Sequence, residues 1–165
     1  MKQRFDIAVV GAGFAGSLLA MIAQRLGQRV IMLERGHHPR VVIGESSTPL
    51  SNLLLEELAV RYDLANIRPF SKWGSWRTSH PELACGLKRG FSFFHHAPGS
   101  AGVVKREDQL LVAASPHDRI SDTHWYRADF DAFLANEAQQ LGVAYLDEVE
   151  LREFIDEERQ ARLRG

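Results

Sequence analysis

The sequence predicts an α/β fold that begins with a Rossmann-like, dinucleotide-binding unit. Residues 5–10 form a short apolar run rich in β-branched side chains, which suits a buried parallel strand. A glycine-rich turn follows at residues 11–16, and a second apolar run at 30–33 ends in the acidic Glu34. A strand, a turn, a helix and a second strand within about 30 residues have the size of a βαβ unit.

The segment between these two strands is expected to be a helix, and the segment after them a loop. Apolar residues follow helical spacing up to Leu26, and Gly27 suits the position just past a helix end. Residues 36–49 are expected to be an extended loop. Thr48 and Pro49 then form a good N-cap and first helical residue, and an apolar stripe predicts a helix over 49–61: Leu50, Leu53, Leu54 and Leu58.

The sequence pattern predicts fewer regular elements in the second half of the chain. Residues 67–87 are irregular in pattern, and short strands are expected at 91–93 and 110–112. Phe91, Phe93 and Phe94 suggest a core strand, with the lining of an aromatic-substrate pocket as the alternative. A further helix is expected from a cap at Asp129 to Gly142, followed by a parallel strand at 143–146 and a charged hairpin or edge strand at 149–165.

These elements supply only three parallel strands, at residues 5–10, 30–34 and 143–146. A doubly wound sheet normally has more strands, so we expect the chain to be a truncated part of such a domain. No linker-like composition interrupts the sequence, and the whole chain is expected to be one unit.

Composition narrows the classes of partner and site. The 20 basic and 21 acidic residues give a net charge of −1, so no nucleic-acid partner is expected. No apolar run is long enough to span a membrane and the N-terminus lacks a signal-peptide pattern, so we expect a cytoplasmic protein without a membrane partner. The single cysteine, Cys85, excludes a disulfide framework, and the histidine pairs lack ligand spacing, so no metal site is expected.

The glycine motif carries the strongest chemical signal. Gly11 allows a tight turn, Gly13 allows a pyrophosphate to approach the backbone, and Gly16 allows the helix to pack close to the strand. Glu34 can accept hydrogen bonds from ribose hydroxyls and would repel the 2′-phosphate of NADP. The alternative is a glycine-rich turn with no ligand.

A second polar motif, Gly44-Glu45-Ser46-Ser47-Thr48-Pro49, precedes the helix expected at 49–61. Its polar groups lie beside a helix N-terminus, which suits a cofactor or an anion. A plain helix-capping segment explains the same residues equally well.

Taken together, these motifs resemble the flavin-dependent halogenase family, within the FAD-dependent monooxygenases. The glycine motif, Arg40 and the segment 44–49 match in order. Leu87-Lys88-Arg89-Gly90-Phe91-Ser92-Phe93 resembles the segment that holds the family's active-site lysine, and Asp122 to Asp131 resembles its aromatic and acidic approach to a helix. The resemblance implies a Rossmann-like FAD-binding domain of the glutathione-reductase-like type over residues 1–165, with 67–120 as the start of a substrate-side insertion.

The resemblance also implies roles for individual residues. Lys88 would be the catalytic lysine, which hydrogen-bonds or captures hypohalous acid made from reduced flavin, oxygen and halide, and delivers halogen to an electron-rich aromatic ring. On the residues alone, a solvated lysine beside Arg89 is the alternative. The implied FAD-binding residues are Gly11, Ala12, Gly13, Ala15, Gly16, Glu34, Arg35, Arg40, Glu45, Ser46, Ser47 and Arg127.

Implied partners are a free or carrier-bound aromatic substrate, a halide ion and a separate flavin reductase. The family's Trp-x-Trp-x-Ile-Pro signature is absent from the sequence, and the spacing from Glu45 to Lys88 is longer than in the tryptophan-acting members. Three alternatives stay open: an FAD-dependent hydroxylase, a flavin-dependent C=C reductase, and a dinucleotide-binding fragment with no activity of its own.

Overall fold

The computed structural model describes residues 4–99, 102, 105–113, 115–157 and 160–164. The chain divides into two compact units. The first unit contains Met1–Gly44, Tyr62–Leu64 and Tyr126–Gly165, and the second contains Glu45–Arg61 and Ala65–Trp125. The second unit includes the whole of the range 67–120, whose assignment as the start of a substrate-side insertion stays a prediction.

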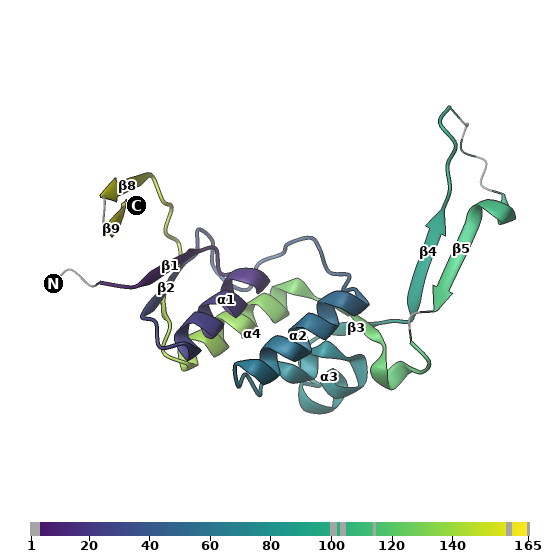
Figure 1. Cartoon of the computed structure of the whole chain (residues 1–165), viewed down its shortest axis with the longest axis horizontal. Coiled ribbons are helices and arrows are strands. Elements are labelled where there is room, and N and C mark those ends of the chain that lie inside the picture. Colours follow the sequence, from purple (N-terminus) through teal and green to yellow (C-terminus); the bar gives the residue numbers. More distant parts are fainter. Residues whose placement is uncertain (1–3, 100–101, 103–104, 114, 158–159, 165) are drawn as a thin grey trace. The chain divides into compact units, whose positions relative to one another are not determined.

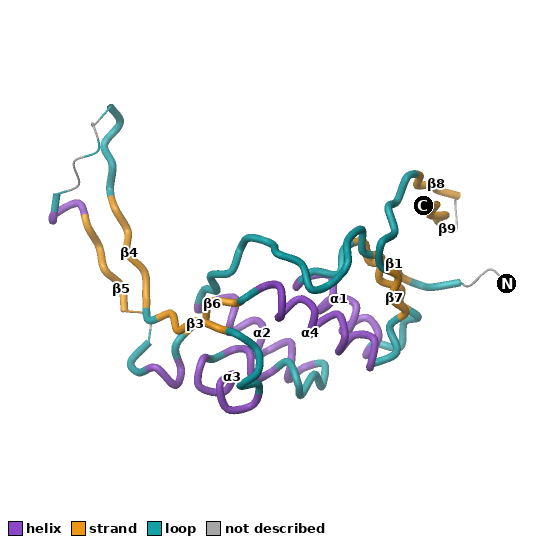
Figure 2. The backbone as a smooth tube through the Cα atoms, turned by 180° about the vertical axis from the view of Figure 1, so that it is seen from behind, coloured by secondary structure: helices purple, strands orange, loops and turns teal. Residues whose placement is uncertain are grey.

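The first unit is built on a three-stranded parallel sheet in the order β1-β2-β7. Its elements are β1 (Ile7–Val10), α1 (Phe14–Arg25), β2 (Val30–Leu33), α4 (Arg127–Gln140) and β7 (Ala144–Leu146). Met32 pairs with Val9 on one side and with Tyr145 on the other, which makes β2 the central strand. The three parallel strands predicted from the sequence are therefore confirmed (β1 and β2 are labelled in Figure 1, β7 in Figure 2).

Helices α1 and α4 lie side by side in the first unit (Figures 1 and 2). The rings of Phe14 and Phe130 are 5.6 Å apart between centroids, and Phe130 and Met21 are fully buried. Both helices end as predicted, with Gly27 and Gly142 at φ of 81° and 96°, the left-handed conformation that glycine adopts without strain.

The predicted N-cap of α4 is wrong. Tyr126 is the N-cap, and Asp129 lies inside the first helical turn. A carboxylate in the first turn still suits the positive end of the helix dipole, which explains why the sequence pattern placed Asp129 near this end. The hairpin expected in the C-terminal segment is confirmed as the antiparallel pair β8 (Glu153–Glu157) and β9 (Gln160–Arg164).

The second unit combines short helices with two separate antiparallel strand pairs. Strand β3 (Cys85–Lys88) pairs with β6 (Asp122–Trp125), and β4 (Gly90–Phe94) pairs with β5 (Gln109–Ala113). The helical elements are α2 (Pro49–Arg61), η1 (Arg68–Ser71), α3 (Trp73–Ser79), η2 (Arg106–Asp108) and η3 (Asp118–Ile120).

Helix α2 has the predicted bounds but does not bury the predicted face. Leu50, Leu53 and Leu54 are exposed, whereas Asn52 and Leu55 are buried. Asn52 turns inward because its amide makes two hydrogen bonds inside the unit, one of them to Asp122 and the other to a serine hydroxyl.

The prediction of irregular structure at residues 67–87 is also wrong. This segment contains η1, α3 and β3, and its core is a T-shaped pair of rings from Phe70 and Trp76, 4.7 Å apart and both fully buried. These elements have only four to seven residues each. They are too short to produce a periodic hydrophobic pattern.

The two strands predicted at 91–93 and 110–112 are confirmed as β4 and β5, but the expected core strand is not. Phe93 and Phe94 are about half exposed, at 53% and 49%. The pair extends away from helices α2 and α3 of its own unit (Figures 1 and 2). It hydrogen-bonds to no other described strand, so its aromatic side chains have no sheet face to pack against.

Candidate functional site

The glycine turn between β1 and α1 has the geometry expected of a phosphate-binding turn. The backbone N–H of Gly11 donates to the carbonyl of Leu33 at 2.7 Å, and its φ of 100° requires glycine. A Cβ added at Gly16 would lie only 1.9 Å from the carbonyl oxygen of Gly11, so helix and strand approach too closely for any side chain. The predicted structural reasons for Gly11 and Gly16 are therefore present.

The N-terminus of α1 is left without a side-chain cap. Gly13 is the N-cap residue, and the first turn contains no acidic side chain. A Cβ at Gly13 would lie 3.6 Å from one guanidinium nitrogen of Arg40 and 3.6 Å from one of Arg127. The Oδ2 atom of Asp131, which accepts a hydrogen bond from Arg127, would lie 3.5 Å from the same Cβ. The N–H groups of the helix N-terminus and the two guanidinium groups favour an anion, and the carboxylates of Glu34 and Asp131 offset part of the positive charge.

Glu34 links the end of β2 to the glycine turn. One carboxylate oxygen, Oε2, accepts the backbone N–H of Ala12 at 2.9 Å and the Nη2 of Arg40 at 3.1 Å, while Oε1 accepts the N–H of Gly36 at 2.9 Å. Burial alone would raise the pKa of Glu34, but these donors together lower it below its ordinary value. The residue is therefore held as a carboxylate, the form that accepts ribose hydroxyls.

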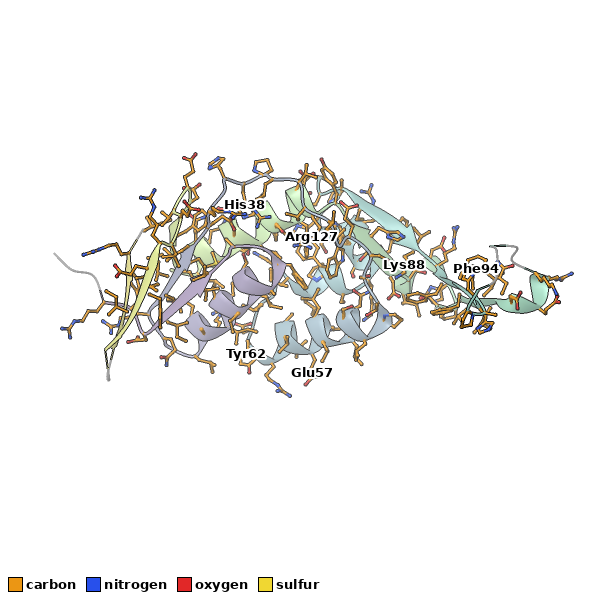
Figure 3. The ribbon with its side chains drawn as sticks, turned by 90° about the horizontal axis from the view of Figure 1, so that it is seen from above. His38, Glu57, Tyr62, Lys88, Phe94 and Arg127 are labelled. Carbon is orange, nitrogen blue, oxygen red and sulfur yellow. The ribbon has the colours of Figure 1, made fainter. Side chains whose placement is uncertain are left out.

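Arg127 is fixed by a carboxylate and by the loop after β2. Its guanidinium makes two hydrogen bonds to Asp131, at 2.7 and 2.8 Å, and Asp131 is fully buried. The Nη1 atom lies 3.3 Å from the carbonyl oxygens of Ile43 and Gly44. His38 reaches the turn from the same loop, because its Nε2 lies 2.9 Å from the carbonyl of Ala12 (Arg127 and His38 are labelled in Figure 3).

These features fit a dinucleotide such as FAD. The bare backbone at Gly13 with two nearby guanidinium groups suits a pyrophosphate, and the ionised Glu34 suits a ribose. The first unit contains nine of the predicted residues, and Arg35 is exposed: Gly11, Ala12, Gly13, Ala15, Gly16, Glu34, Arg35, Arg40 and Arg127.

The other predicted residues belong to the second unit. Glu45 and Ser46 are exposed, and their backbones run beside β6: the N–H of Trp125 donates to the carbonyl of Glu45 at 2.7 Å, and Ser46 forms a β-bridge with His124. Ser47 is buried, with its hydroxyl donating to the carbonyl of Thr123 at 2.7 Å. The segment 45–47 thus behaves as a short additional strand, and its role toward a cofactor stays a prediction.

Lys88 is a buried residue, so the solvated surface lysine considered above is excluded. Its exposed fraction is 7%, and its ammonium donates to the backbone carbonyl of Ser47 (Lys88 is labelled in Figure 3). The Nζ atom also lies 3.9 Å from the ring centre of Phe91. Burial lowers the pKa of Lys88, and the nearby charge of Asp122 partly opposes this effect.

Three residues near these sites were not predicted. Asp131 follows Arg127 by four residues on a helix. This spacing is typical of an ion pair, so the pair could have been predicted from the sequence. Asn52 and Asp122 gave no comparable signal, because they meet through strand and helix packing between distant parts of the sequence. Among the described residues, no group of three His, Cys, Asp or Glu side chains could hold a metal ion, and no helix is long and apolar enough to cross a membrane.

The fold and the glycine turn are those of a dinucleotide-binding α/β protein. No family model matches the sequence. The chain is 30% identical over 141 residues to the monodechloroaminopyrrolnitrin halogenase PrnC of Pseudomonas fluorescens, and 27% identical over 142 residues to the tetracycline 7-halogenase of Kitasatospora aureofaciens. These alignments cover 86% and 84% of this chain and 24% of each relative.

A solved structure shows the same relationship. The halogenase PltM, crystallised with phloroglucinol and FAD, superposes with a TM-score of 0.84 at 25% sequence identity, over 98% of this chain and 31% of PltM. The chain is thus homologous to flavin-dependent halogenases over most of its length and has the fold of part of their FAD-binding region, as the sequence motifs predicted. It spans about a quarter of the length of the curated relatives.

Proposed function

We propose that this chain is the cofactor-binding part of an FAD-dependent halogenase that modifies an electron-rich aromatic substrate. The observation that carries the proposal is the burial of Lys88 in a chain homologous to halogenases, with its amine between the Ser47 carbonyl and the Phe91 ring. A glycine turn alone does not distinguish a halogenase, because many flavoproteins and other dinucleotide-binding proteins have one.

In this proposal the first unit binds FAD through the α1 N-terminus and Glu34. The pyrophosphate would lie at Gly13, where Arg40 and Arg127 supply positive charge, and the adenosine ribose would bond to Glu34. When bound in its reduced form, FAD supplies the electrons with which oxygen and halide give hypohalous acid. The residues of this chain bind and orient the group, and the presence of FAD in crystals of PltM supports the choice of cofactor.

Lys88 would handle the halogen. As an ammonium it donates a hydrogen bond to hypohalous acid and leaves the halogen more electrophilic. As a neutral amine it forms an N–halogen bond while the oxygen–halogen bond breaks, and its proton leaves with the hydroxide as water. Partial removal of the amine from water lowers the pKa of Lys88 and so favours the neutral form more than in a solvated lysine.

The proposed partners follow from the same assignment. The substrate would be a free or carrier-bound aromatic ring, and a relative named as a 1H-pyrrole-2-carbonyl-[peptidyl-carrier protein] chlorinase supports the carrier-bound form. Halide is the co-substrate, a separate flavin reductase would supply the reduced cofactor, and a cytoplasmic location suits that supply.

The first experiment is a titration of the chain with FAD and, separately, with NAD, followed by flavin fluorescence and thermal stability. Selective stabilisation by FAD is the expected result, and binding of neither by a folded sample contradicts the cofactor assignment. Assays with reduced FAD, oxygen, bromide and phloroglucinol then separate the activities. A bromide-dependent product supports a halogenase, oxygen insertion a hydroxylase, oxygen-independent reduction a C=C reductase, and binding without turnover a fragment with no activity of its own.

Within that assay, Lys88→Met removes the amine and keeps most of the side-chain length. The variant is expected to bind FAD like the parent chain and to lose bromide-dependent product. Product formed at the parental rate by Lys88→Met excludes Lys88 as the halogen-handling residue.

A further inference from the structure

Strands β3 and β6 place a carboxylate directly opposite the buried lysine. Lys88 and Asp122 are paired across the antiparallel ladder, so their side chains leave the same face of the two strands. Both are buried, with exposed fractions of 7% and 5%. Two ionisable side chains on one buried face are costly unless each is compensated.

Asn52 ties the carboxylate to the carbonyl that holds the amine. Its Nδ2 donates to Oδ1 of Asp122 at 2.7 Å and to the hydroxyl oxygen of Ser47 at 3.1 Å. The carbonyl of the same Ser47 accepts the ammonium of Lys88. A helix, a strand-like segment and two strands are therefore joined in one buried polar cluster, which consists of Ser47, Asn52, Lys88, Asp122 and Thr123.

The other charged groups near Lys88 are directed elsewhere. Arg89 follows it in sequence but is exposed and makes two 2.8 Å hydrogen bonds to Asp118. Helix α2 contributes the uncharged Asn52, and β4 contributes the ring of Phe91. On β6, His124 is exposed and pairs with Gly86 rather than with Lys88. Among the described residues, Asp122 is the charged group that acts on the amine.

We propose that Asp122 is a positioning residue for Lys88: Asn52 fixes its carboxylate inside the buried cluster, and its negative charge favours the ammonium form of the lysine. The proposal rests on the proposed function for the chemical task of Lys88. It adds a residue that shifts the balance between the two forms toward the ammonium, which donates hydrogen bonds to an oxidant, whereas only a neutral amine captures halogen. Asp122 thus directs the site toward hydrogen-bond activation.

The test measures the protonation of Lys88 without any turnover. The full chain is treated with a small amine acylating reagent over a range of pH, and labelling of Lys88 is followed by peptide mass spectrometry. Asp122→Asn is expected to move the labelling midpoint to lower pH and to raise the rate below that midpoint on the order of tenfold. Asp122→Glu should restore the parental midpoint, and Asp118→Asn, which removes an exposed carboxylate near the same strand, should leave it unchanged.

A merely structural role for Asp122 predicts that the labelling midpoint of Lys88 in Asp122→Asn moves to higher pH. If Asp122→Asn only loosened the cluster, Lys88 would gain water and its pKa would return upward toward the ordinary value of 10.5. A midpoint that rises or stays in place therefore overturns the proposal.

Should Asp122→Asn not fold, the parental chain supplies a second test by NMR. The side-chain carboxyl carbon of Asp122 is expected to show an inflection at the pH at which Lys88 loses its proton, and absence of that inflection overturns the proposal. Because these readouts involve no flavin, failure to bind FAD or to form halogenated product concerns the proposed function alone.

Discussion

Glu34 accepts the backbone N–H of Ala12 at 2.9 Å, which joins the acidic end of β2 to the glycine turn after β1. The same carboxylate accepts the N–H of Gly36 through its other oxygen. One side chain therefore fixes both the turn and the start of the following loop, while its ionised form is kept available for a ribose. The local fold and the candidate cofactor site depend on the same group.

Replacement of Glu34 by Gln tests this double role. The amide cannot accept through both of its ends, so one buried backbone N–H loses its partner and stability at pH 7 should fall by about 1–3 kcal/mol. Urea unfolding at pH 7 measures the change. Glu150→Gln, which removes the charge of an exposed carboxylate of the same unit, is the control for loss of charge alone. Equal stability of Glu34→Gln and the parent would show that these hydrogen bonds do not stabilise the fold.

The contribution of Glu34 should also depend on pH. Its pKa is lowered in the folded chain below the ordinary value of 4.5, so the unfolded chain binds the proton first as the pH falls. The stabilisation is therefore complete above about pH 4.5 and is lost as the pH falls through the folded pKa. The free energies of unfolding of the parent and of Glu34→Gln, measured at a series of pH values, should converge at low pH. A difference between them that stays constant down to the acid transition would contradict the assignment.

Gly16→Ala tests the close contact between α1 and the glycine turn. The new Cβ would lie 1.9 Å from the carbonyl oxygen of Gly11, and a backbone atom has no room to move aside. The variant should lose about 3 kcal/mol or more. Gly36→Ala is the matched control, because its Cβ would approach no atom closer than 3.4 Å. Denaturant unfolding compares the two, and a Gly16→Ala chain as stable as Gly36→Ala would contradict the packing described.

Gly13→Ala separates cofactor binding from folding. In the ligand-free chain the added methyl group would make only ordinary contacts, at 3.5–3.6 Å, with the side chains of Asp131, Arg127 and Arg40. It would, however, occupy the approach to the α1 N-terminus where a pyrophosphate is proposed. The melting temperature without ligand should stay close to that of the parent, and FAD affinity should fall at least tenfold. Unchanged FAD affinity in the folded variant would place the cofactor elsewhere.

The first unit was predictable from sequence because each of its signals is local. A β-branched run, a glycine turn and a helix ending at Gly27 lie within one short segment, and their physical reasons do not depend on distant residues. The second unit was predicted less well. Helix α3 and strand β3 are too short for a pattern, and the leucines of α2 fit a helix without indicating which face is buried.

The residues of the candidate site also differ in how well they could be predicted from the sequence. Gly11, Gly16 and Glu34 were assigned from the motif, and the structure gives them the conformations that the motif requires. Lys88 was suggested by resemblance, but its burial arises from a strand pairing that the sequence does not encode locally. Asp122 was therefore missed, because only the β3–β6 register places it opposite the lysine.

Arg127 and Asp131 form an ion pair. Removal of Arg127 alone should lower the stability more than removal of both charges. Asp131 is fully buried and accepts two hydrogen bonds from the guanidinium, so Arg127→Ala leaves a buried carboxylate without its cation. Such a change costs about 3–5 kcal/mol in typical buried pairs.

Adding Asp131→Asn to Arg127→Ala removes the unpaired charge and should recover a large part of the stability, measured by urea unfolding. FAD affinity should not recover in this double variant, because the cation near Gly13 is still missing. Arg29→Ala, at an exposed pair of the same unit, should change stability little and leave FAD affinity intact. A double variant that regains both stability and FAD affinity would mean that Arg127 acts only through folding.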